Sequence, residues 1–571
     1  MTCPYDELLS RLQSAFDRVA EGADPVLRPS ERGDYQANGV MALAKSQGVA
    51  PREMAQRVLD VLDLSGVADV EVAGPGFLNL TLTSDYLDQT LRALLDDERL
   101  GVATVTPRTA VIDYSAPNVA KEMHVGHLRS TVIGDALARI YRFRGYSVVA
   151  RSHVGDWGTP FGMLIEHLVD LGEATAMAAL SIGDLDGFYR AARVKFESDE
   201  DFRERSRQRV VSLQGGDPET RRLWQILVDE SVAYFAEVYA ALDVTLTPDD
   251  VVGESYYNDM LDAVVSDLDA AGLLVESAGA LCVFPEGFTN REGEPLPLIV
   301  KKRDEGFGYA ATDLAAIRDR VDHLHADELL YVVGAPQSQH FEMVFAVARA
   351  AGWLPADRRC EHVAFGNVLG PDRKMFKTRS GETIKLIDLL EEATERAEAA
   401  LVQRSNDFSP EERHQLATQI ARAAIKYADL SNDRQRDYVF DLERMIAFEG
   451  DTGPYLQYAH ARLRSIFRRL GAPWDPRAAT FLLGDGAERD LARGLIAFPE
   501  AVDAAMATLH PHRLSGYLFD LAQRFTTFYE ACPVLSAPEP SRTERLALCE
   551  LTARTLRLGL SLLGIEAPEQ M

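Results

Sequence analysis

Hydrophobic residues along the first hundred positions follow two different spacings. Over residues 7–20 they recur every three or four positions, which predicts a helix with one apolar face. Over residues 77–82 they recur at every second position, after the turn Gly74-Pro75-Gly76, which predicts a strand with one buried face. A further apolar run at 70–72 suggests a partner strand. These patterns predict a small α+β domain over residues 1–103.

From residue 104 onward, strand-like and helix-like patterns alternate. An apolar run at 111–114 is followed by a helical pattern that Gly145 closes, and a second strand-like run follows at 147–151. Strands that alternate with helices in this way are typical of a parallel α/β sheet. We therefore expect such a sheet to begin here.

The segment at about 171–297 breaks this alternation. It is more charged and mostly helical, so we interpret it as an insertion. Strand-like runs return after it at 298–300, 329–333 and 362–365. We expect a doubly wound sheet over residues 104–400 that is split by the insertion and resumed after it.

The last part of the chain, residues 401–571, shows only helical patterns. Ser409 followed by Pro410 and, three positions on, Glu412 has the residues of a helix N-cap with a capping box. Long amphipathic segments follow to the end of the sequence. We expect an all-α bundle here.

Length, charge and cysteine content narrow the class of protein. At 571 residues the chain is too long for one hydrophobic core, so several domains are expected. The net charge of −28 argues against indiscriminate binding of nucleic acid, although a local basic face could still bind RNA specifically. One short helical run could form such a basic face, although it could also be an ordinary solvated helix face. It contains Arg462, Arg464, Arg468 and Arg469.

The cysteines and the N-terminal residues bear on the compartment. The five cysteines are scattered without a C-x-x-C pair, which favours reduced structural thiols over a disulfide framework or a zinc ribbon. No window is apolar enough to span a membrane, and the N-terminus lacks the apolar core of a signal peptide. We expect a cytoplasmic protein.

The segment 115–131 contains the strongest candidate chemistry. It lies between the expected strand at 111–114 and the following helix, and it contains His124, Gly126 and His127. Backbone N–H groups at a helix N-terminus bind phosphate, glycine allows close approach, and imidazoles can stabilise charge on a reacting phosphate. By itself the motif could equally be histidines of a turn and a core.

A second candidate segment follows much later. Lys374 and Lys377 lie three residues apart, with Thr378, Ser380 and Gly381 beside them. Such a loop can hold a di- or triphosphate by point charge. By itself it could be a solvated basic loop, and only the fold could bring it near the histidines.

Together, the two segments resemble the HIGH and KMSKS signatures of class I aminoacyl-tRNA synthetases. Val125 replaces Ile in the first signature, and Phe376 and Thr378 replace serines in the second. Several other segments resemble the bacterial type of arginyl-tRNA synthetase across essentially the whole chain: residues 33–38, 113–118, 121–123, 153–158 and 454–459. The resemblance implies a Rossmann-type catalytic domain, an additional N-terminal tRNA-binding domain and a C-terminal anticodon-binding bundle.

The resemblance implies a set of residues for adenylate formation. His124, His127, Lys374 and Lys377 would stabilise the transition state, and Lys121 resembles a lysine that shares this task in some family members. Gly126 and Asn118 would also contact ATP. ATP would act with Mg²⁺ as a substrate complex, without zinc or an organic cofactor.

The resemblance also implies an arginine site. Its matching positions are Asp113, Asn118, Tyr309, Asp313 and Gln337. These residue types suit the substrate, because a guanidinium is a charged, fixed fork of donors that needs carboxylates and planar acceptors. The chain departs from the family's pattern at Pro160, Ala310 and Ala311, which puts the fine shape of the pocket in question.

Two further groups of residues match tRNA contacts of the family. Phe77 and Asn79 of the N-terminal domain match positions that stack on, and hydrogen-bond to, a D-loop base, and aromatic stacking of splayed bases is typical of RNA recognition. In the C-terminal bundle the corresponding segment offers rings, amides and charge: Tyr455, Gln457, Tyr458, His460 and Arg462.

The sequence thus predicts an arginine–tRNA ligase with tRNA(Arg), L-arginine and ATP as partners, no membrane association and, as is typical of the family, a monomeric state. One alternative is a class I paralogue for another amino acid, although the acidic pair Asp113 and Asp313 favours a cationic side chain. Another is a catalytically silent tRNA-binding protein. Silent relatives usually lose signature histidines or lysines, and this chain keeps them.

Overall fold

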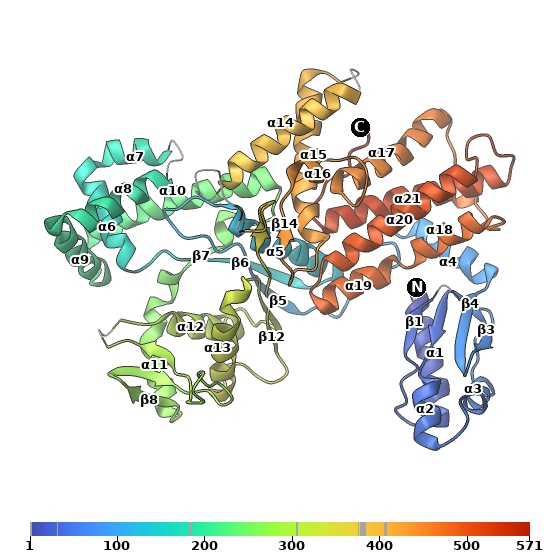
Figure 1. The fold of residues 1–571 in the computed structure, drawn as a ribbon, viewed down its shortest axis with the longest axis horizontal. Helices are drawn as coiled ribbons and strands as arrows, with labels where there is room; N and C mark the ends of the chain where they lie inside the picture. The colour runs from blue at the N-terminus through green and yellow to red at the C-terminus, as the bar shows by residue number, and fades with distance from the viewer. Residues whose placement is uncertain are drawn as a thin grey trace. The chain divides into compact units, whose positions relative to one another are not determined.

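The structure is a computed structural model that describes residues 3–30, 32–181, 185–303, 306–374, 376, 384–404 and 408–571 (Figure 1). The chain forms two compact units. Unit 1 combines Met1–Thr104 with Phe448–Ser561 and Glu566–Met571, and unit 2 combines Val105–Ala447 with Leu562–Ile565. In the part of the chain that is described, no helix is both long and apolar enough to cross a membrane.

The N-terminal part of unit 1 is the predicted small α+β fold. Its antiparallel sheet has the order β1-β2-β4-β3. The alternation seen at 77–82 becomes β4, whose central position in the sheet buries Leu78, Leu80 and Leu82. The elements are α1 (Pro4–Val19), β1 (Leu27–Pro29), β2 (Tyr35–Ala37), α2 (Val40–Gln47), α3 (Pro51–Leu59), β3 (Ala68–Ala73), β4 (Phe77–Leu82) and α4 (Ser84–Asp96).

The C-terminal part of unit 1 is helical, as predicted. It consists of α17 (Gly453–Leu470), α18 (Gly486–Ile496), α19 (Phe498–Thr508), α20 (His512–Ala531) and α21 (Ser541–Leu562). Buried polar contacts join it to the N-terminal sheet: the Asp34 carboxylate pairs with Arg489 at 3.2 Å and Arg493 at 2.6 Å. Tyr35 donates to Glu500 of α19 at 2.5 Å. The two ends of the chain therefore form one unit.

Unit 2 is built on a parallel sheet with the order β12-β11-β5-β6-β7. The order reverses between β5 and β11, and ligands of open α/β sheets bind at the carboxyl ends of strands beside such a switch point. The strands are β5 (Thr109–Asp113), β6 (Ser147–Val154), β7 (Val251–Gly253), β11 (Glu328–Tyr331) and β12 (Arg359–His362). The predicted runs at 111–114, 147–151, 329–333 and 362–365 correspond to β5, β6, β11 and the end of β12.

The insertion differs from the prediction. Helices follow β6 as expected: α6 (Thr159–Leu171), α7 (Glu173–Ser181), α8 (Leu185–Ser198), α9 (Glu200–Gln214) and α10 (Pro218–Leu242). The chain then returns to the parallel sheet as β7, which pairs with β6 inside the range assigned to the insertion. Strand β7 has only three residues, so no periodicity marked it.

A second small sheet holds the strand predicted at 298–300. It has the order β10-β9-β8 and is antiparallel, so the prediction that 298–300 rejoins the parallel sheet is wrong. Leu298 and Val300 are buried while Ile299 is 45% exposed, which is the alternation of a sheet with one covered face. The elements are α11 (Asn258–Ala270), β8 (Leu274–Ser277), β9 (Ala280–Val283) and β10 (Leu298–Lys301).

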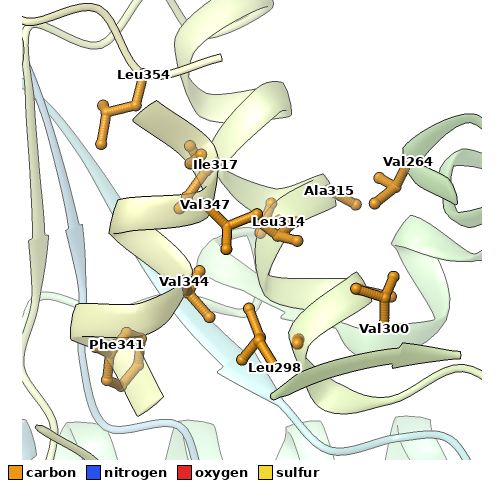
Figure 2. Packing of buried hydrophobic residues seen from close by; sticks show 14 of the residues in the cluster. Val264, Leu298, Val300, Leu314, Ala315, Ile317, Phe341, Val344, Val347 and Leu354 are labelled. Atoms are coloured by element: carbon orange, nitrogen blue, oxygen red, sulfur yellow. The ribbon is translucent and has the colours of Figure 1, made fainter. Parts of the chain in front are cut away.

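Helix α12 (Tyr309–Asp322) connects the small sheet to β11 of the parallel sheet, and α13 (Ser338–Ala350) connects β11 to β12. Figure 2 shows the apolar layer that joins them: Leu298 and Val300 of β10 lie near Leu314 of α12 and Val344 of α13. This core fixes α12, because a core residue cannot move without opening a void.

The end of unit 2 includes helices that the sequence assigned to the last domain. Strand β13 (Val368–Leu369) pairs in parallel with β14 (Tyr438–Val439), and between them lie α14 (Leu386–Arg404) and α15 (Pro410–Leu430), with α16 (Leu442–Met445) after them. Unit 2 therefore continues to Ala447 and not to residue 400. The capping box at Ser409 is confirmed, since Ser409 Oγ accepts from Glu412 N–H at 3.2 Å.

Candidate functional site

The two histidines cap the helix that leaves β5, α5 (Val125–Arg144). His124 is the N-cap, and its Nδ1 accepts from the backbone N–H of Gly126 at 3.0 Å. The Nδ1 of His127 in turn accepts from the backbone N–H of His124 at 3.1 Å. A neutral imidazole that accepts at Nδ1 carries its proton at Nε2. Each ring therefore presents an Nε2–H donor at the start of α5.

Burial keeps both imidazoles neutral. It lowers the pKa of His124, and it lowers the pKa of His127 to about 3, with His124 as a further cause. The ring centroids lie 4.1 Å apart. Two protonated rings this close would repel each other. The pair can thus donate hydrogen bonds to phosphate oxygens without itself needing to gain a proton.

Gly126 is needed for this arrangement. A Cβ atom at Gly126 would lie 2.6 Å from Cε1 and 2.8 Å from Nδ1 of His124. Any side chain would therefore push the His124 ring off the helix N-terminus. Gly126 is also exposed, so no side chain covers the start of α5 at this position.

The lysine segment follows β13. The Lys374 carbonyl accepts from Gly370 N–H at 2.7 Å, and the Lys374 side chain is exposed. Phe376 stacks on Phe440, with ring centroids 4.8 Å apart. Lys377, Thr378, Ser380 and Gly381 lie outside the described residues. Where the described chain resumes, Ile384 accepts a hydrogen bond from the N–H of Val125. The fold therefore brings the chain that follows the second signature to the start of α5.

A cavity of about 830 Å³ opens at the carboxyl ends of β5 and β6. It is lined by Asn118 and Tyr309, two of the predicted arginine residues, and by Lys121. Tyr309 is 73% exposed at the start of α12. The Lys121 ammonium lies 4.6 Å from the ring centroid of Tyr189 in α8. Pro160, the departure from the family's pattern in α6, also lines this cavity.

The other two departures face elsewhere. Ala310 and Ala311 are buried in the apolar core of unit 2, with 3% and 0% exposure. Hydroxyls at these positions would face that core, so the alanines leave the cavity wall unchanged.

The two predicted acidic residues have different surroundings. Asp113, at the end of β5, is buried and accepts from Arg320 Nη2 at 2.6 Å. Asp313 is half-buried, and its Oδ2 lies 2.6 Å from Nε2 of His340 on α13. Tyr309, Asp313 and Arg320 are spaced by four and seven residues, so they share one face of α12. Only Asp313 of the two carboxylates has no cationic arginine or lysine bound to it among the described contacts.

Gln337 is exposed and ends the short 3₁₀ helix Ala335–Gln337, which follows β11. It does not line the cavity among the described residues. Like Asn118, which follows β5, it lies beyond the carboxyl end of a strand that borders the switch point.

Glu254 is a residue of this site that sequence reasoning missed. It lines the cavity with Asn118 and Tyr309, and desolvation, followed by the charges of Asp156 and Asp313, raises its pKa to about 7. A Cβ atom at Gly155 would lie 2.9 Å from Asn118 Oδ1 and 3.9 Å from Glu254 Oε1. Glu254 reaches the cavity because β7, directly before it, pairs with β6. No sequence pattern marked that pairing.

In the N-terminal sheet, Phe77 is half-buried at the start of β4, directly after the glycine-containing turn. Asn79 is 7% exposed and its Oδ1 accepts from Gln36 Nε2 at 2.7 Å. The two predicted residues thus lie on one strand, but only the ring of Phe77 retains substantial exposure.

The predicted residues of α17 separate into two groups. Tyr458 is 39% exposed, and the Arg462 guanidinium lies 4.4 Å from the ring centroid of Tyr529. Tyr455 is half-buried and accepts from Gln523 Nε2 at 3.2 Å. Gln457 and His460, in contrast, are buried and bind the C-terminal tail.

Several polar side chains of α17 bind the C-terminal tail. Gln457 Nε2 donates to the Glu566 carbonyl at 2.8 Å, and His460 Nδ1 lies 3.0 Å from the Pro568 carbonyl. Arg464 pairs with Glu569 at 2.8 Å. Arg468 donates to the carbonyl of the same Glu569 at 2.7 Å. Part of the arginine run in α17 therefore binds the tail and is not simply a solvated face.

Known protein families match this chain along its whole length. The model for the catalytic domain of "tRNA synthetases class I (R)" matches residues 89–442. The model for the arginyl tRNA synthetase N-terminal domain matches residues 6–82, and the DALR anticodon binding domain matches residues 456–571.

Individual relatives agree with the family models. The arginine–tRNA ligase of Thermobifida fusca is 54% identical over all of both chains, and that of Laribacter hongkongensis is 49% identical over 99% of each. The arginyl-tRNA synthetase structure from Plasmodium falciparum covers all of both chains at 28% identity with a TM-score of 0.86. The one from Thermus thermophilus covers 99% of this chain and all of its own at 27% identity, with a TM-score of 0.83.

These matches, the order of the domains and the paired histidines at the start of α5 lead to one conclusion: the chain belongs to the arginyl-tRNA synthetase family of class I aminoacyl-tRNA synthetases.

Proposed function

We propose that this chain activates L-arginine with Mg-ATP and transfers it to tRNA(Arg). In the first step an oxygen of the arginine carboxylate attacks the α-phosphorus of ATP, and pyrophosphate leaves. In the second step the 2′-hydroxyl of the terminal adenosine attacks the carbonyl carbon of arginyl-adenylate, and AMP leaves. The observation that carries this proposal is the pair of neutral Nε2–H donors at the start of α5, at the switch point of the sheet.

His124 and His127 stabilise the charge that develops on the α-phosphate. Hydrogen-bond donors that are already oriented need no reorganisation during the reaction, which is why such groups lower barriers effectively. Lys374 and Lys377 bind the departing pyrophosphate, and Lys121, at the cavity wall, adds a positive charge. Gly126 and Asn118 complete the ATP contacts. With no covalent nucleophile among these residues, catalysis consists of positioning and electrostatic stabilisation.

The substrate arginine binds in the 830 Å³ cavity. Asp313 and Glu254 are the carboxylates that meet its cationic groups, Tyr309 packs against its aliphatic chain, and Asn118 supplies an amide contact. In the described part of the chain Gln337 does not line this cavity, so we assign it no contact with the bound arginine. Asp113 already holds the guanidinium of Arg320, so we assign it to keeping the end of β5 against α12, in place of a direct contact with substrate.

For tRNA, we propose contacts at both ends of unit 1. Phe77 stacks on a base, with Asn79 beside it, and Tyr455, Tyr458 and Arg462 of α17 meet the anticodon loop. Burial disfavours direct tRNA contact by Gln457 and His460, which we assign to holding the C-terminal tail on α17.

The test is exchange of labelled pyrophosphate into ATP by the purified chain, with L-arginine and tRNA(Arg) present. We expect exchange with arginine and none with lysine or glutamine. Absence of exchange with all three amino acids would contradict the proposed activity, and exchange with another amino acid would assign a different substrate. We further propose that the chain works as a monomer in the cytoplasm and that its ATP is bound to Mg²⁺. Sedimentation of the purified chain measures the oligomeric state, and titration of magnesium in the exchange assay measures the dependence on Mg²⁺.

A further inference from the structure

The chain on either side of the lysine signature is held in different ways. Upstream, β13 pairs with β14, and Phe376 N–H donates to the Val368 carbonyl at 3.2 Å. Downstream, the segment 384–386 lies antiparallel to the segment 123–125 that starts α5. Val125 N–H donates to the Ile384 carbonyl at 3.2 Å, and Leu386 N–H donates to the Met123 carbonyl at 2.9 Å. The downstream end therefore meets the histidine signature directly.

An ion pair lies at this junction. The Lys385 ammonium is 3.0 Å from Glu122 Oε1 and 2.8 Å from Glu122 Oε2. The Glu122 side chain is 2% exposed, whereas that of Lys385 is 41% exposed. Glu122 is two residues before His124, and Lys385 pairs with His124 through the backbone bridge. Glu122 thus adjoins the histidine signature, and Lys385 lies downstream of the lysine signature.

The backbone around Glu122 is fixed from the other side. Glu122 N–H donates to Asp186 Oδ1 at 3.1 Å, Met123 N–H donates to Tyr234 Oη at 3.2 Å, and Ala120 N–H donates to Ser231 Oγ at 2.9 Å. These bonds hold the backbone that carries the Glu122 carboxylate. A buried carboxylate that loses its cation is strongly unfavourable, so the pair favours one position of the 384–386 segment.

We propose that Glu122 and Lys385 are positioning residues that fix the downstream end of the lysine signature against His124. The pair does not touch substrate. Its role is to set where the chain enters α14 after the lysine signature, and so to align the two phosphate-binding segments. This inference rests on the proposed adenylation activity. Geometric displacements of about 1 Å can reduce rates about 100-fold, so the effect should appear in the rate of adenylation.

The test compares variants at Lys385 by arginine-dependent ATP–pyrophosphate exchange in the presence of tRNA. We expect Lys385→Met to lower kcat at least about tenfold while KM for arginine stays within about twofold, because the arginine cavity does not include this pair. Lys385→Arg keeps the charge and should restore kcat to within about threefold of the parent chain. The double variant combines Glu122→Gln with Lys385→Met. Because Glu122→Gln removes the charge that Lys385→Met leaves unpaired, the double variant should be no slower than Lys385→Met alone.

Lys195→Met is the matched control. Lys195 is 37% exposed and pairs at 3.1 Å with Asp170, whose side chain is 28% exposed, so this variant removes a lysine of similar exposure from a pair with a less buried carboxylate. We expect this variant to keep the parent kcat. Thermal unfolding of every variant shows whether a lower kcat merely reflects less folded protein.

Several outcomes would overturn the inference: a parent-like kcat in Lys385→Met, a loss that follows the unfolded fraction, no rescue by Lys385→Arg, or additive losses in the double variant. If the parent chain itself shows no exchange with arginine and tRNA, the proposed function fails, and the pair loses the activity on which its role rests.

Discussion

In the proposed arginine site, the raised pKa of Glu254 predicts that arginine binding depends on pH. The guanidinium and the α-ammonium group of arginine meet a carboxylate favourably only when that carboxylate is ionised. Burial and the neighbouring charges of Asp156 and Asp313 raise the pKa of Glu254 from 4.5 to about 7. We therefore predict that arginine binds more tightly as the pH rises through 7.

The magnitude follows from the ionised fraction. With a pKa of about 7, the carboxylate is ionised in roughly one molecule in eleven at pH 6 and in roughly ten in eleven at pH 8. The Kd for arginine should then fall about tenfold between these pH values, provided only the ionised form binds. Replacing Glu254 with Gln removes one charge-assisted hydrogen bond, worth about 1.5–3 kcal/mol, which weakens binding by roughly 10- to 150-fold at pH 8.

Isothermal titration of the chain with L-arginine at pH 6, 7 and 8 measures these values. The matched control is Asp259→Asn, which removes a carboxylate that lines the same cavity but is exposed to solvent. We expect it to retain the tenfold change, whereas Glu254→Gln should lose it. A Kd for the parent chain that is flat between pH 6 and 8 would refute this reasoning, as would an undiminished pH dependence in Glu254→Gln.

Three other predictions concern catalysis and stability. His127→Asn should lower kcat of pyrophosphate exchange by about 100- to 1000-fold, as expected for the loss of one preorganised donor, with an unchanged Kd for arginine by titration; a smaller effect than tenfold would exclude a direct role. Asp429→Asn should destabilise unit 2 by about 3–5 kcal/mol in urea unfolding. The Asp429 carboxylate lies 3.1 Å from the buried Arg129 guanidinium, which the substitution leaves without a counter-charge. A loss below about 1 kcal/mol would contradict this expectation. Burial raises the pKa of Glu500 from 4.5 to about 7, so between these pH values the folded state holds a proton that the unfolded state releases. The free energy of unfolding should therefore fall by up to about 1.4 kcal/mol per pH unit as the pH rises from about 5 to 7. Glu500→Gln should flatten that slope in thermal unfolding at pH 5, 6 and 7, and an unchanged slope would assign it to another group.

Local patterns in the sequence predicted much of this fold because they depend on neighbours in the chain. The apolar spacing before and after the first signature predicted β5 and α5, and Gly145 closes α5 in the left-handed conformation, with φ of 98°. The capping box at Ser409 needed only its own four residues. The histidine signature is similarly local, since each imidazole bonds a backbone N–H no more than three residues away.

Only the tertiary structure decided which distant residues meet. Periodicity tells whether a strand has one or two buried faces, but it does not name the neighbouring strand. The sequence therefore missed β7 and placed 298–300 in the wrong sheet. Those two pairings form the proposed arginine site, because β7 brings Glu254 to the cavity and β10 packs against α12, which carries Tyr309 and Asp313.

The charges of the site were decided in the same way. The resemblance to the family implied that Asp113 and Asp313 meet a cation, but the fold places Arg320 on Asp113 and leaves Asp313 beside His340. The sequence by itself determined the family and the order of the domains, and it predicted the chemistry of the proposed phosphate site. Which carboxylate remains for the proposed substrate depends on desolvation and on partners such as Arg320, 207 residues from Asp113, and these contacts exist only once the chain has folded.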